Sequence, residues 1–215
     1  MEALGWITID TAHRRPVTIG TLGPAGTSSE QAAGLASRRL AAADDHPRLR
    51  LFDTYEEAAG ALRSGEVSHF VVANAYKSVN EFYMDTRIAL AEVFVMDTPE
   101  YGLAVPDDGR EVPARPVIAS HPSPVPLIMQ LLPDRYTAGE IKVMSSTSLA
   151  ARAAVDGATD LALTTETAAR LHGLRFISRT RPIRMLWSVF VAERPAGPAT
   201  GKSAPERGPS VHPRP

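Results

Sequence analysis

Hydroxyl side chains gather at four points where a strand-like segment is followed by a helix-like segment. A helix N-terminus has unpaired amide groups and a partial positive charge, so it attracts anions. Ligands of open α/β sheets bind at the carboxyl ends of the strands, where such junctions lie. Together the junctions predict a cleft whose neutral donors suit a small carboxylate, although each one alone is explained equally well as a capped helix without a ligand. They are GPAGTSS at 23–29, SHPSP at 120–124, SSTSLAA at 145–151 and TTETAA at 164–169.

The first junction has the spacing of a capped helix start. Thr27 followed by Glu30 matches a capping box with Thr27 as the N-cap. Gly26 lets a ligand approach the backbone closely, and the hydroxyls of Ser28 and Ser29 add donors. The segment lacks both the Lys-Ser/Thr of a Walker A loop and the G-x-G-x-x-G of a dinucleotide fingerprint, so neither kind of nucleotide site is predicted.

The composition excludes several classes of function. The 215 residues carry 23 Lys and Arg against 24 Asp and Glu, which gives no electrostatic footprint for nucleic acid. Cysteine is absent, so disulfides and thiolate sites are excluded, and no close pair of histidines predicts a metal site. No apolar run approaches the ~20 residues that span a bilayer, and the first residues lack the order of a signal peptide. We therefore expect a cytoplasmic globular protein that binds neither nucleic acid nor membrane.

Strand-like and helix-like segments alternate along most of the chain. This alternation predicts right-handed βαβ crossovers, parallel sheets and the α/β class. The predicted strands cover 17–23, 49–53, 69–75, 89–106 with an interruption at Pro99, 116–122, 141–146, 160–165, 174–180 and 185–193. The predicted helices cover 28–43, 54–65, 123–133, 147–157 and 166–173.

The two ends differ from the region between them. Residues 1–15 are interpreted as an N-terminal extension, in which WITID could add an edge strand. Residues 196–215 are rich in Pro, Gly and Ser and nearly free of large apolar groups, so they are predicted to be a disordered tail. The predicted folded domain is therefore 16–195.

Four segments resemble motifs of the prephenate dehydratase family. GPAGTSSEQAA resembles its G-P-x-G-T-[FY]-[ST] motif, SHPSPVPLI its S-H-P-x-x-L segment, SSTSLAARAAVDG its S-T-x-x-A-A helix start, and LALTTETAARLHGL its A-A-I-x-x-x-x-A-A-x-x-Y-G-L stretch. The resemblance extends over roughly residues 17 to 193. It implies a two-lobed, periplasmic-binding-protein-like (type II) α/β fold, like the catalytic domain of those enzymes, with the substrate between the lobes. Lobe 1 would comprise about 16–95 plus 178–195, and lobe 2 about 99–177.

The chain departs from the dehydratases at two motifs. Their signature Thr-Arg-Phe is replaced within MLWSVFV, where Trp187 and Ser188 stand about where Thr and Arg would be. Their Glu-Asn-Ser segment is altered within VVANAYKSVNEFYMD. These departures fit a narrower group, because five segments resemble the bacilysin-type prephenate decarboxylases, a dehydratase offshoot from antibiotic and other non-ribosomal amino-acid pathways. The five segments lie at 21–33, 75–84, 97–105, 120–124 and 187–190.

That resemblance implies a carboxy-lyase that decarboxylates prephenate without making its ring aromatic. The product would be a dihydro-4-hydroxyphenylpyruvate that keeps the ring hydroxyl. Dehydratases need a proton donor at that hydroxyl, a role attributed to their Thr, whereas a tryptophan offers one weak N–H. The ring diene itself takes up the electrons of the broken bond, so neither a metal nor an organic cofactor is expected.

The resemblance and the junctions together give a set of candidate site residues. The first junction would hold one carboxylate and the third junction the other, while Trp187 would press on the ring. The candidates for catalysis are Tyr76, Tyr83 and His121 as proton donors, and Trp187. The candidates for substrate binding are Thr27, Ser28, Ser29, Asn74, Ser120, Ser146, Thr147, Ser148 and Ser188. Core packing is the alternative for Tyr83 and Trp187, and fixing a loop is the alternative for His121.

Two rival functions stay open at this point. A true dehydratase giving phenylpyruvate would use the same fold, although the replacement at 187–188 argues against it. A non-catalytic two-lobed protein that binds a small acid would use the same anion sites. Lys77 and Arg184 are interpreted as solvated, although a dianion invites at least one cation. The expected partner is the small molecule prephenate, and a homodimer is left open.

Overall fold

The computed structural model describes residues 3–9, 16–41 and 48–193. The predicted disordered tail, 196–215, lies outside the described residues, as do 1–2 and 10–15 of the predicted N-terminal extension. The part of that extension which is described contains a short strand, β1 (Gly5–Thr8), which pairs antiparallel with β5 (Ile88–Asp97).

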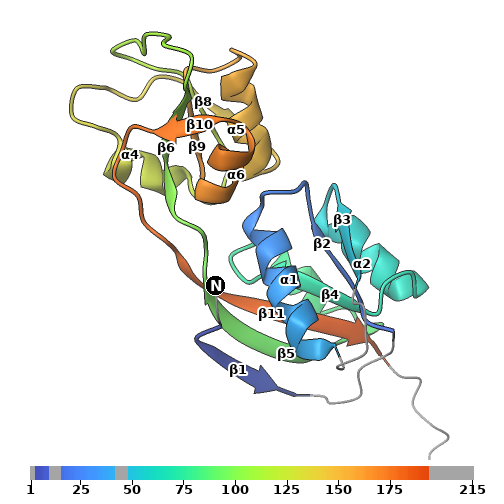
Figure 1. Ribbon diagram of the computed structural model, residues 1–215. Coiled ribbons are helices and arrows are strands. Elements are labelled where there is room, and N and C mark those ends of the chain that lie inside the picture. The colour runs from blue at the N-terminus through green and yellow to red at the C-terminus, as the bar shows by residue number, and fades with distance from the viewer. Residues whose placement is uncertain (1–2, 10–15, 42–47, 194–215) are drawn as a thin grey trace, which may run out of the picture.

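The described residues form two sheets with helices packed against each, and the two units lie one above the other in Figure 1. Lobe 1 comprises β1, β5, β11 (Arg184–Ala192), β4 (His69–Ala73), β2 (Thr18–Leu22) and β3 (Arg48–Phe52) in sheet order, with helices α1 (Ser28–Leu40), α2 (Tyr55–Ser64) and α3 (Val79–Tyr83). Lobe 2 comprises β10 (Leu174–Phe176), β6 (Tyr101–Pro106), β9 (Leu161–Thr165), β7 (Ile118–Ser120) and β8 (Ile141–Val143), with η1 (Val125–Leu127), α4 (Ile128–Leu131), α5 (Thr147–Val155) and α6 (Glu166–Leu171).

Both sheets are mixed, so the prediction of parallel sheets is wrong. Strand β2 is parallel to β3 and β4, and β7 is parallel to β8 and β9. Strand β11 is antiparallel to β4 and β5, and β6 is antiparallel to β9 and β10. The physical reason is that β6 and β11 enter their lobes from the junction between the lobes. They therefore run against the strands whose carboxyl ends face that junction, and side-chain periodicity carries no information about strand direction.

Helix α1 forms where the capping box predicted it. The Thr27 hydroxyl accepts from the Glu30 amide at 3.2 Å, and the Glu30 carboxylate accepts from the Gly26 amide at 2.7 Å. Ala32, Ala33 and Ala36 on one stripe of the helix are fully buried. The cap fixes where the helix starts, and the stripe fixes which face it turns to lobe 1.

The structure differs from the predicted elements at two places, 123–133 and 79–83, and agrees with them at a third. The predicted helix at 123–133 is a 3₁₀ turn, η1, followed by the four-residue helix α4, because prolines at its start remove backbone donors. The interruption predicted at Pro99 within 89–106 is confirmed, because β5 ends at Asp97 and β6 begins at Tyr101. Helix α3 was not predicted, since its five residues carry too few periodic positions to signal a helix.

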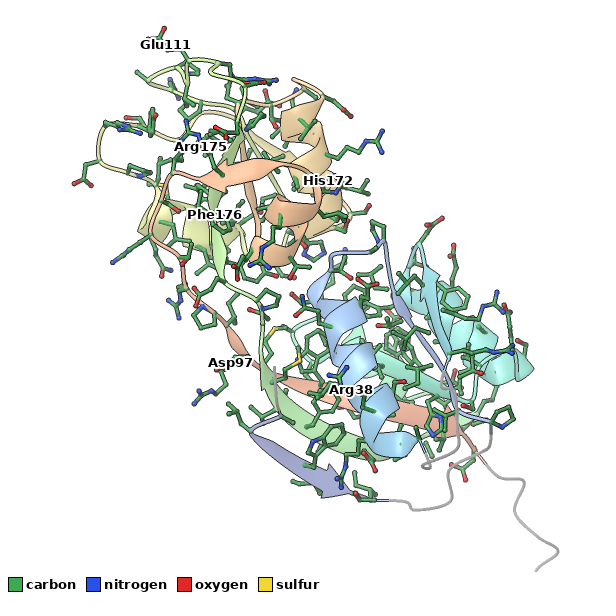
Figure 2. The ribbon with its side chains drawn as sticks, viewed as in Figure 1. Arg38, Asp97, Glu111, His172, Arg175 and Phe176 are labelled. Atoms are coloured by element: carbon green, nitrogen blue, oxygen red, sulfur yellow. The ribbon has the colours of Figure 1, made fainter. Side chains whose placement is uncertain are left out.

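The chain passes between the lobes twice, and the two crossing segments are bonded to each other. The Thr98 amide donates to the Ile183 carbonyl at 2.9 Å, and the Ile183 amide donates to the Thr98 hydroxyl at 3.0 Å. One step farther, Tyr101 and Arg181 exchange two backbone hydrogen bonds at 2.8 and 3.0 Å. Asp97, labelled beside this junction in Figure 2, pairs with Arg184 of β11. The crossing segments thus form one two-stranded connection.

Among the described helices, none combines the length and the hydropathy needed to cross a lipid bilayer.

Gly102 in β6 marks a close approach that the fold requires. A Cβ at this position would lie 2.7 Å from Cδ1 of Phe176 and 3.0 Å from Cγ2 of Thr180. We expect Gly102→Ala to lower the free energy of unfolding by about 1–3 kcal/mol, because the ring has to move. Urea denaturation measures this, with Gly5→Ala as the matched control, since nothing lies within 4 Å of a Cβ there. Equal stability of the two variants would contradict the close packing at Gly102.

Candidate active site

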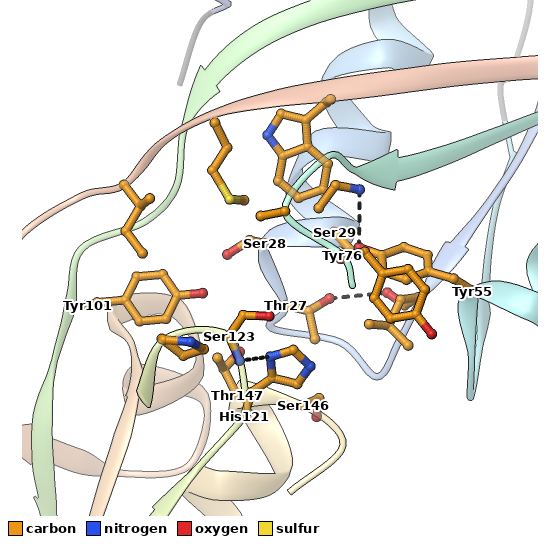
Figure 3. Close-up of a pocket in the computed structure, with 17 residues that line it drawn as sticks. Thr27, Ser28, Ser29, Tyr55, Tyr76, Tyr101, His121, Ser123, Ser146 and Thr147 are labelled. Carbon is orange, nitrogen blue, oxygen red and sulfur yellow. Dashed lines mark hydrogen bonds between the residues drawn. The ribbon is translucent and has the colours of Figure 1, made fainter. Parts of the chain in front are cut away.

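A pocket of about 170 Å³ lies where the two lobes and their crossing segments meet. Figure 3 shows its labelled side chains coming from α1, α2 and the segment after β4 in lobe 1, and from β6, the segment after β7 and the start of α5 in lobe 2. Lobe 1 and the crossing segment contribute Leu22, Thr27, Ser28, Ser29, Tyr55, Ala73, Ala75, Tyr76, Ile183, Met185 and Trp187. Lobe 2 contributes Tyr101, His121, Ser123, Pro124, Ser146 and Thr147. The pocket therefore brings together residues from both halves of the chain.

The lobes also touch beside the pocket, at the loop that precedes α1. The Thr165 hydroxyl donates to the Gly26 carbonyl at 3.3 Å, and the Gln31 amide group bonds the Thr167 hydroxyl. Gly26 has φ of +87°, and a Cβ there would lie 3.2 Å from Leu171 of lobe 2. A residue without a side chain is thus needed for the left-handed backbone and for the close approach of the lobes.

The start of α1 offers backbone amides rather than the Thr27 hydroxyl. That hydroxyl accepts from the Glu30 amide and donates to the Leu22 carbonyl at 3.3 Å, so its own hydrogen bonds are made within the protein. Ser28 and Ser29 occupy the first turn, where amides have no acceptor inside the helix. Thr27 therefore positions these amides, which are the groups able to bind a carboxylate.

The start of α5 has the same construction on the opposite wall. The Ser146 hydroxyl accepts from the Leu149 amide at 3.1 Å, and the Thr147 carbonyl accepts from the Thr164 hydroxyl at 2.8 Å. Ser146 and Thr147 both line the pocket. The N-termini of α1, a helix of 13 residues, and of α5, a helix of 9 residues, thus reach one cavity from different lobes.

His121 is held as a neutral hydrogen-bond donor. The Ser123 amide donates to its Nδ1 at 3.3 Å, so Nε2 carries the ring proton in the neutral form. Burial, with a smaller effect from the Lys77 charge, lowers the pKa of His121 below its ordinary value. The ring can therefore donate one hydrogen bond from Nε2 at neutral pH.

Two buried polar atoms of the pocket have no partner among the described residues. They are the hydroxyl oxygen of Ser28, a residue 7% exposed, and the indole nitrogen of Trp187, which is fully buried. Leaving a buried donor or acceptor unpaired costs about 1–3 kcal/mol, so each such group calls for an explanation. Both residues belong to the lining of the pocket.

The three tyrosines of the pocket have different surroundings. The Tyr55 hydroxyl is 2.6 Å from the Ser29 hydroxyl and accepts from the Ala73 amide at 3.5 Å, and burial raises its pKa to about 12. The Tyr76 hydroxyl donates to the Glu56 carboxylate at 2.6 Å, and burial together with that carboxylate raises its pKa to about 12.

The third, Tyr101, has a hydroxyl that makes no hydrogen bond within the described residues. Figure 3 shows this hydroxyl pointing toward Ser28. Burial raises the pKa of Tyr101, and the nearby Ser28 hydroxyl opposes the shift although the two groups do not reach hydrogen-bond geometry.

No charged side chain lines the described pocket. Of the two cations considered from the sequence, Arg184 is paired with Asp97 at the crossing segments, and Lys77 is exposed next to Tyr76. Lys77 lies close enough to act on the pKa of His121. Helix ends and hydroxyls therefore supply most of the attraction for an anion.

Five predicted site residues lie outside the pocket lining. Asn74, Tyr83 and Ser188 form a triangle of hydrogen bonds of 2.6–2.9 Å. Ser188 follows Trp187 in β11, and neighbouring residues of a strand point to opposite faces, so only Trp187 faces the pocket. The Ser120 hydroxyl donates to the His121 carbonyl at 2.8 Å, and the Ser148 hydroxyl is 2.9 Å from Nε2 of His172, labelled in Figure 2.

Several lining residues were not singled out from the sequence. Tyr55 directly follows the cap of α2, and Tyr101 stands inside the DTPEYGLAV motif, but both read as ordinary core aromatics. Ser123 belongs to the second hydroxyl-rich junction, which was the available signal for it. Ile183 belongs to the crossing segment and Met185 to the start of β11, and the place of neither beside the pocket can be read from local pattern.

Two α/β lobes joined by paired crossing segments, with a pocket between them, define the class of periplasmic-binding-protein-like domains, and this confirms the predicted fold class. The solved structures agree. A prephenate dehydratase from Arthrobacter aurescens in complex with L-Phe has a TM-score of 0.63 at 15% identity, covering 83% of this chain and 61% of that chain. A periplasmic substrate-binding protein of an ABC transporter from Coxiella burnetii has a TM-score of 0.51 at 17% identity, covering 82% and 84%. At such identities these likenesses concern the fold alone.

Curated relatives identify the family. A protein named prephenate decarboxylase from Planktothrix agardhii (strain NIVA-CYA 126/8) is 38% identical over 178 residues, covering 82% of this chain and 88% of its own. Another from Bacillus amyloliquefaciens is 37% identical over 178 residues, covering 81% and 86%. No protein-family model matches the chain. The chain belongs to the prephenate decarboxylase family, as the motifs implied.

The lowered pKa of His121 leads to a pH prediction. Its pKa in the folded protein lies below the value of about 6.5 in the unfolded chain, so protonating it opposes folding. Its contribution to stability is therefore present above pH ~6.5 and is lost as the pH falls toward the folded pKa. We expect the His121 ring signal in NMR, assigned with His121→Asn, to titrate below the same signal in urea-unfolded protein. Titration at or above the unfolded value would contradict this environment.

Proposed function

We propose that this protein decarboxylates prephenate and retains the ring hydroxyl, so that the product is a dihydro-4-hydroxyphenylpyruvate. Membership of the prephenate decarboxylase family supports the substrate and the reaction class. The observation that carries the proposal is the pair of buried, unpartnered groups on Ser28 and Trp187 in a pocket with a helix start on either side. Such a pocket fits a small molecule with several oxygen acceptors.

The two helix starts suit the two carboxylates of prephenate. The first-turn amides of Ser28 and Ser29 would bind one carboxylate, and those at Thr147 and Ser148 of α5 would bind the other. Because the helices belong to different lobes, a ligand held by both helps to keep the pocket closed. His121 adds a hydrogen bond from Nε2. The dianion is thus held by neutral groups, with Lys77 as a nearby cation.

The chemistry needs little beyond correct placement. The bond between the quaternary ring carbon and its carboxylate breaks, and the electron pair enters the ring diene. A dehydratase would next protonate the departing hydroxyl, but the Trp187 N–H is no acid for that step. The electrons instead end on a ring carbon that takes a proton. A buried, uncharged lining favours the decarboxylation itself, because it raises the energy of the localised carboxylate more than that of the dispersed charge.

The product is a non-aromatic keto acid, which suits antibiotic or other secondary amino-acid biosynthesis in the cytoplasm. A homodimer stays a prediction.

Product analysis tests the proposal directly. We expect prephenate incubated with the protein to give a species with ring alkene protons beside a retained carbinol proton in the proton NMR spectrum. Aromatic ring protons would mean a dehydratase, and unchanged prephenate beside a no-enzyme control would favour a non-catalytic binder. Either of these results would overturn the proposal.

Thr27 tests the role of the α1 start. We expect Thr27→Val to lower the free energy of unfolding by about 1 kcal/mol through the lost cap. It should also raise KM several-fold with little change in kcat, because the amides it positions hold a carboxylate equally in the ground and transition states. The matched control is Thr54→Val, since Thr54 caps α2 by the same bond, at 3.1 Å, but does not line the pocket. Equal KM values for the two variants would reduce Thr27 to a structural cap.

A further inference from the structure

We propose that Tyr101 is the acid that delivers the proton to the ring, an inference that rests on the proposed function. Sequence reasoning did not consider this residue. The geometry points to it because, within the described pocket, it is the tyrosine whose hydroxyl the protein leaves free.

The other tyrosines near the site are already engaged. The Tyr55 hydroxyl is bonded to Ser29 and to the Ala73 amide. The half-buried Tyr76 donates a hydrogen bond from its hydroxyl to the Glu56 carboxylate. The Tyr83 hydroxyl belongs to the triangle with Asn74 and Ser188, outside the pocket lining. Each would have to break a hydrogen bond before it could turn its proton to a substrate.

The backbone of Tyr101 is fixed by hydrogen bonds, whereas its side-chain hydroxyl makes none within the described residues. It is the first residue of β6, and its backbone exchanges two hydrogen bonds with Arg181 across the crossing segments. The residue is only 7% exposed, and its ring lies in the pocket wall with the hydroxyl toward Ser28 (Figure 3). The phenol therefore has a fixed position, and the Ser28 hydroxyl toward which it points does not reach hydrogen-bond geometry with it, so its proton is available, as an acid that acts on bound substrate requires.

His121 is the remaining rival, and its protonation state argues against it. At neutral pH the buried ring is neutral, and a neutral imidazole is a weaker acid than a phenol. Tyr101 is protonated under the same conditions, because burial disfavours its phenolate. His121 thus serves as a hydrogen-bond donor, and Tyr101 is the group with a proton to give.

The step balances without a further reactant. Loss of carbon dioxide places an electron pair in a new double bond at the former quaternary carbon. The π pair of the neighbouring alkene moves to its far carbon, which lies next to the carbinol carbon and takes the Tyr101 proton. The resulting phenolate accepts a hydrogen bond from Ser28, whose hydroxyl has no other partner, and regains a proton from water after product leaves. The hydroxyl is kept because the acid sits at the carbon beside it.

The test is Tyr101→Phe with prephenate in D₂O. Wild-type protein should give product with a single deuterium on one face of that carbon. We expect the variant to lose about 100-fold or more in kcat, with KM changed by no more than a few-fold, as general-acid catalysis predicts. Any residual product should be a mixture of two epimers, each with one deuterium, because solvent then delivers the deuteron to either face of the ring. Tyr136→Phe is the matched control and should behave as wild type, since Tyr136 lies outside the pocket lining.

A fluorinated tyrosine at position 101 separates acid catalysis from packing. Its more acidic phenol should lower the pH at which kcat is lost, an effect that a purely structural residue would not produce. If Tyr101→Phe keeps kcat within about threefold and deuterates the same single face, the proposal is overturned. If wild-type protein makes no dihydro product at all, the proposed function fails first, and the wild-type spectrum alone reveals that.

Discussion

Thr98 and Ile183 join the two crossing segments through a reciprocal pair of hydrogen bonds, and the way the two walls of the pocket face each other depends on this pairing. The pairing continues the hydrogen-bond ladder of β5 and β11 out of lobe 1. The Tyr101–Arg181 bridge continues it further to the edge of lobe 2. Two unpaired linkers would let the lobes move independently, whereas a bonded pair restricts their relative position. The α1 and α5 starts can then face one cavity, with Tyr101 across from Ser28.

Under the proposed function, the pocket binds an anion with polar groups that the protein itself leaves unsatisfied. Buried groups without partners, such as those on Ser28 and Trp187, each cost about 1–3 kcal/mol of stability. The surrounding core offsets this cost, since the Trp187 ring stacks near Phe94 with centroids 6.5 Å apart in a fully buried layer. Groups held ready in this way need no rearrangement when substrate arrives. A ligand that satisfies them should also stabilise the fold, because it binds only the folded state.

Local chemistry could be predicted from the sequence, but the direction and facing of strands could not. The α1 cap depends on Thr27 and Glu30, three residues apart, so short-range spacing sufficed. Whether a residue of β11 faces the pocket depends on which strands lie beside it, here β4 and β5, and no local pattern contains that register. Tyr101 was missed for a related reason. From the sequence pattern alone, a tyrosine inside an apolar strand is predicted to pack in the core. Only the positions of the partner strand and of the opposite lobe show that it faces a pocket.

The facing of β11 also changes how the departure from the dehydratase signature should be understood. Trp187 and Ser188 stand side by side in the sequence but act on opposite faces of the sheet. Trp187 reaches the pocket, whereas Ser188 is fully buried and joins Asn74 and Tyr83. An arginine at 188 would therefore place a charge in a buried hydrogen-bond cluster rather than near substrate, at a high cost in stability. Under the proposed function, Trp187 and Tyr101 on the opposite wall are therefore the residues placed to act on the ring hydroxyl, whereas Ser188 faces away from the pocket.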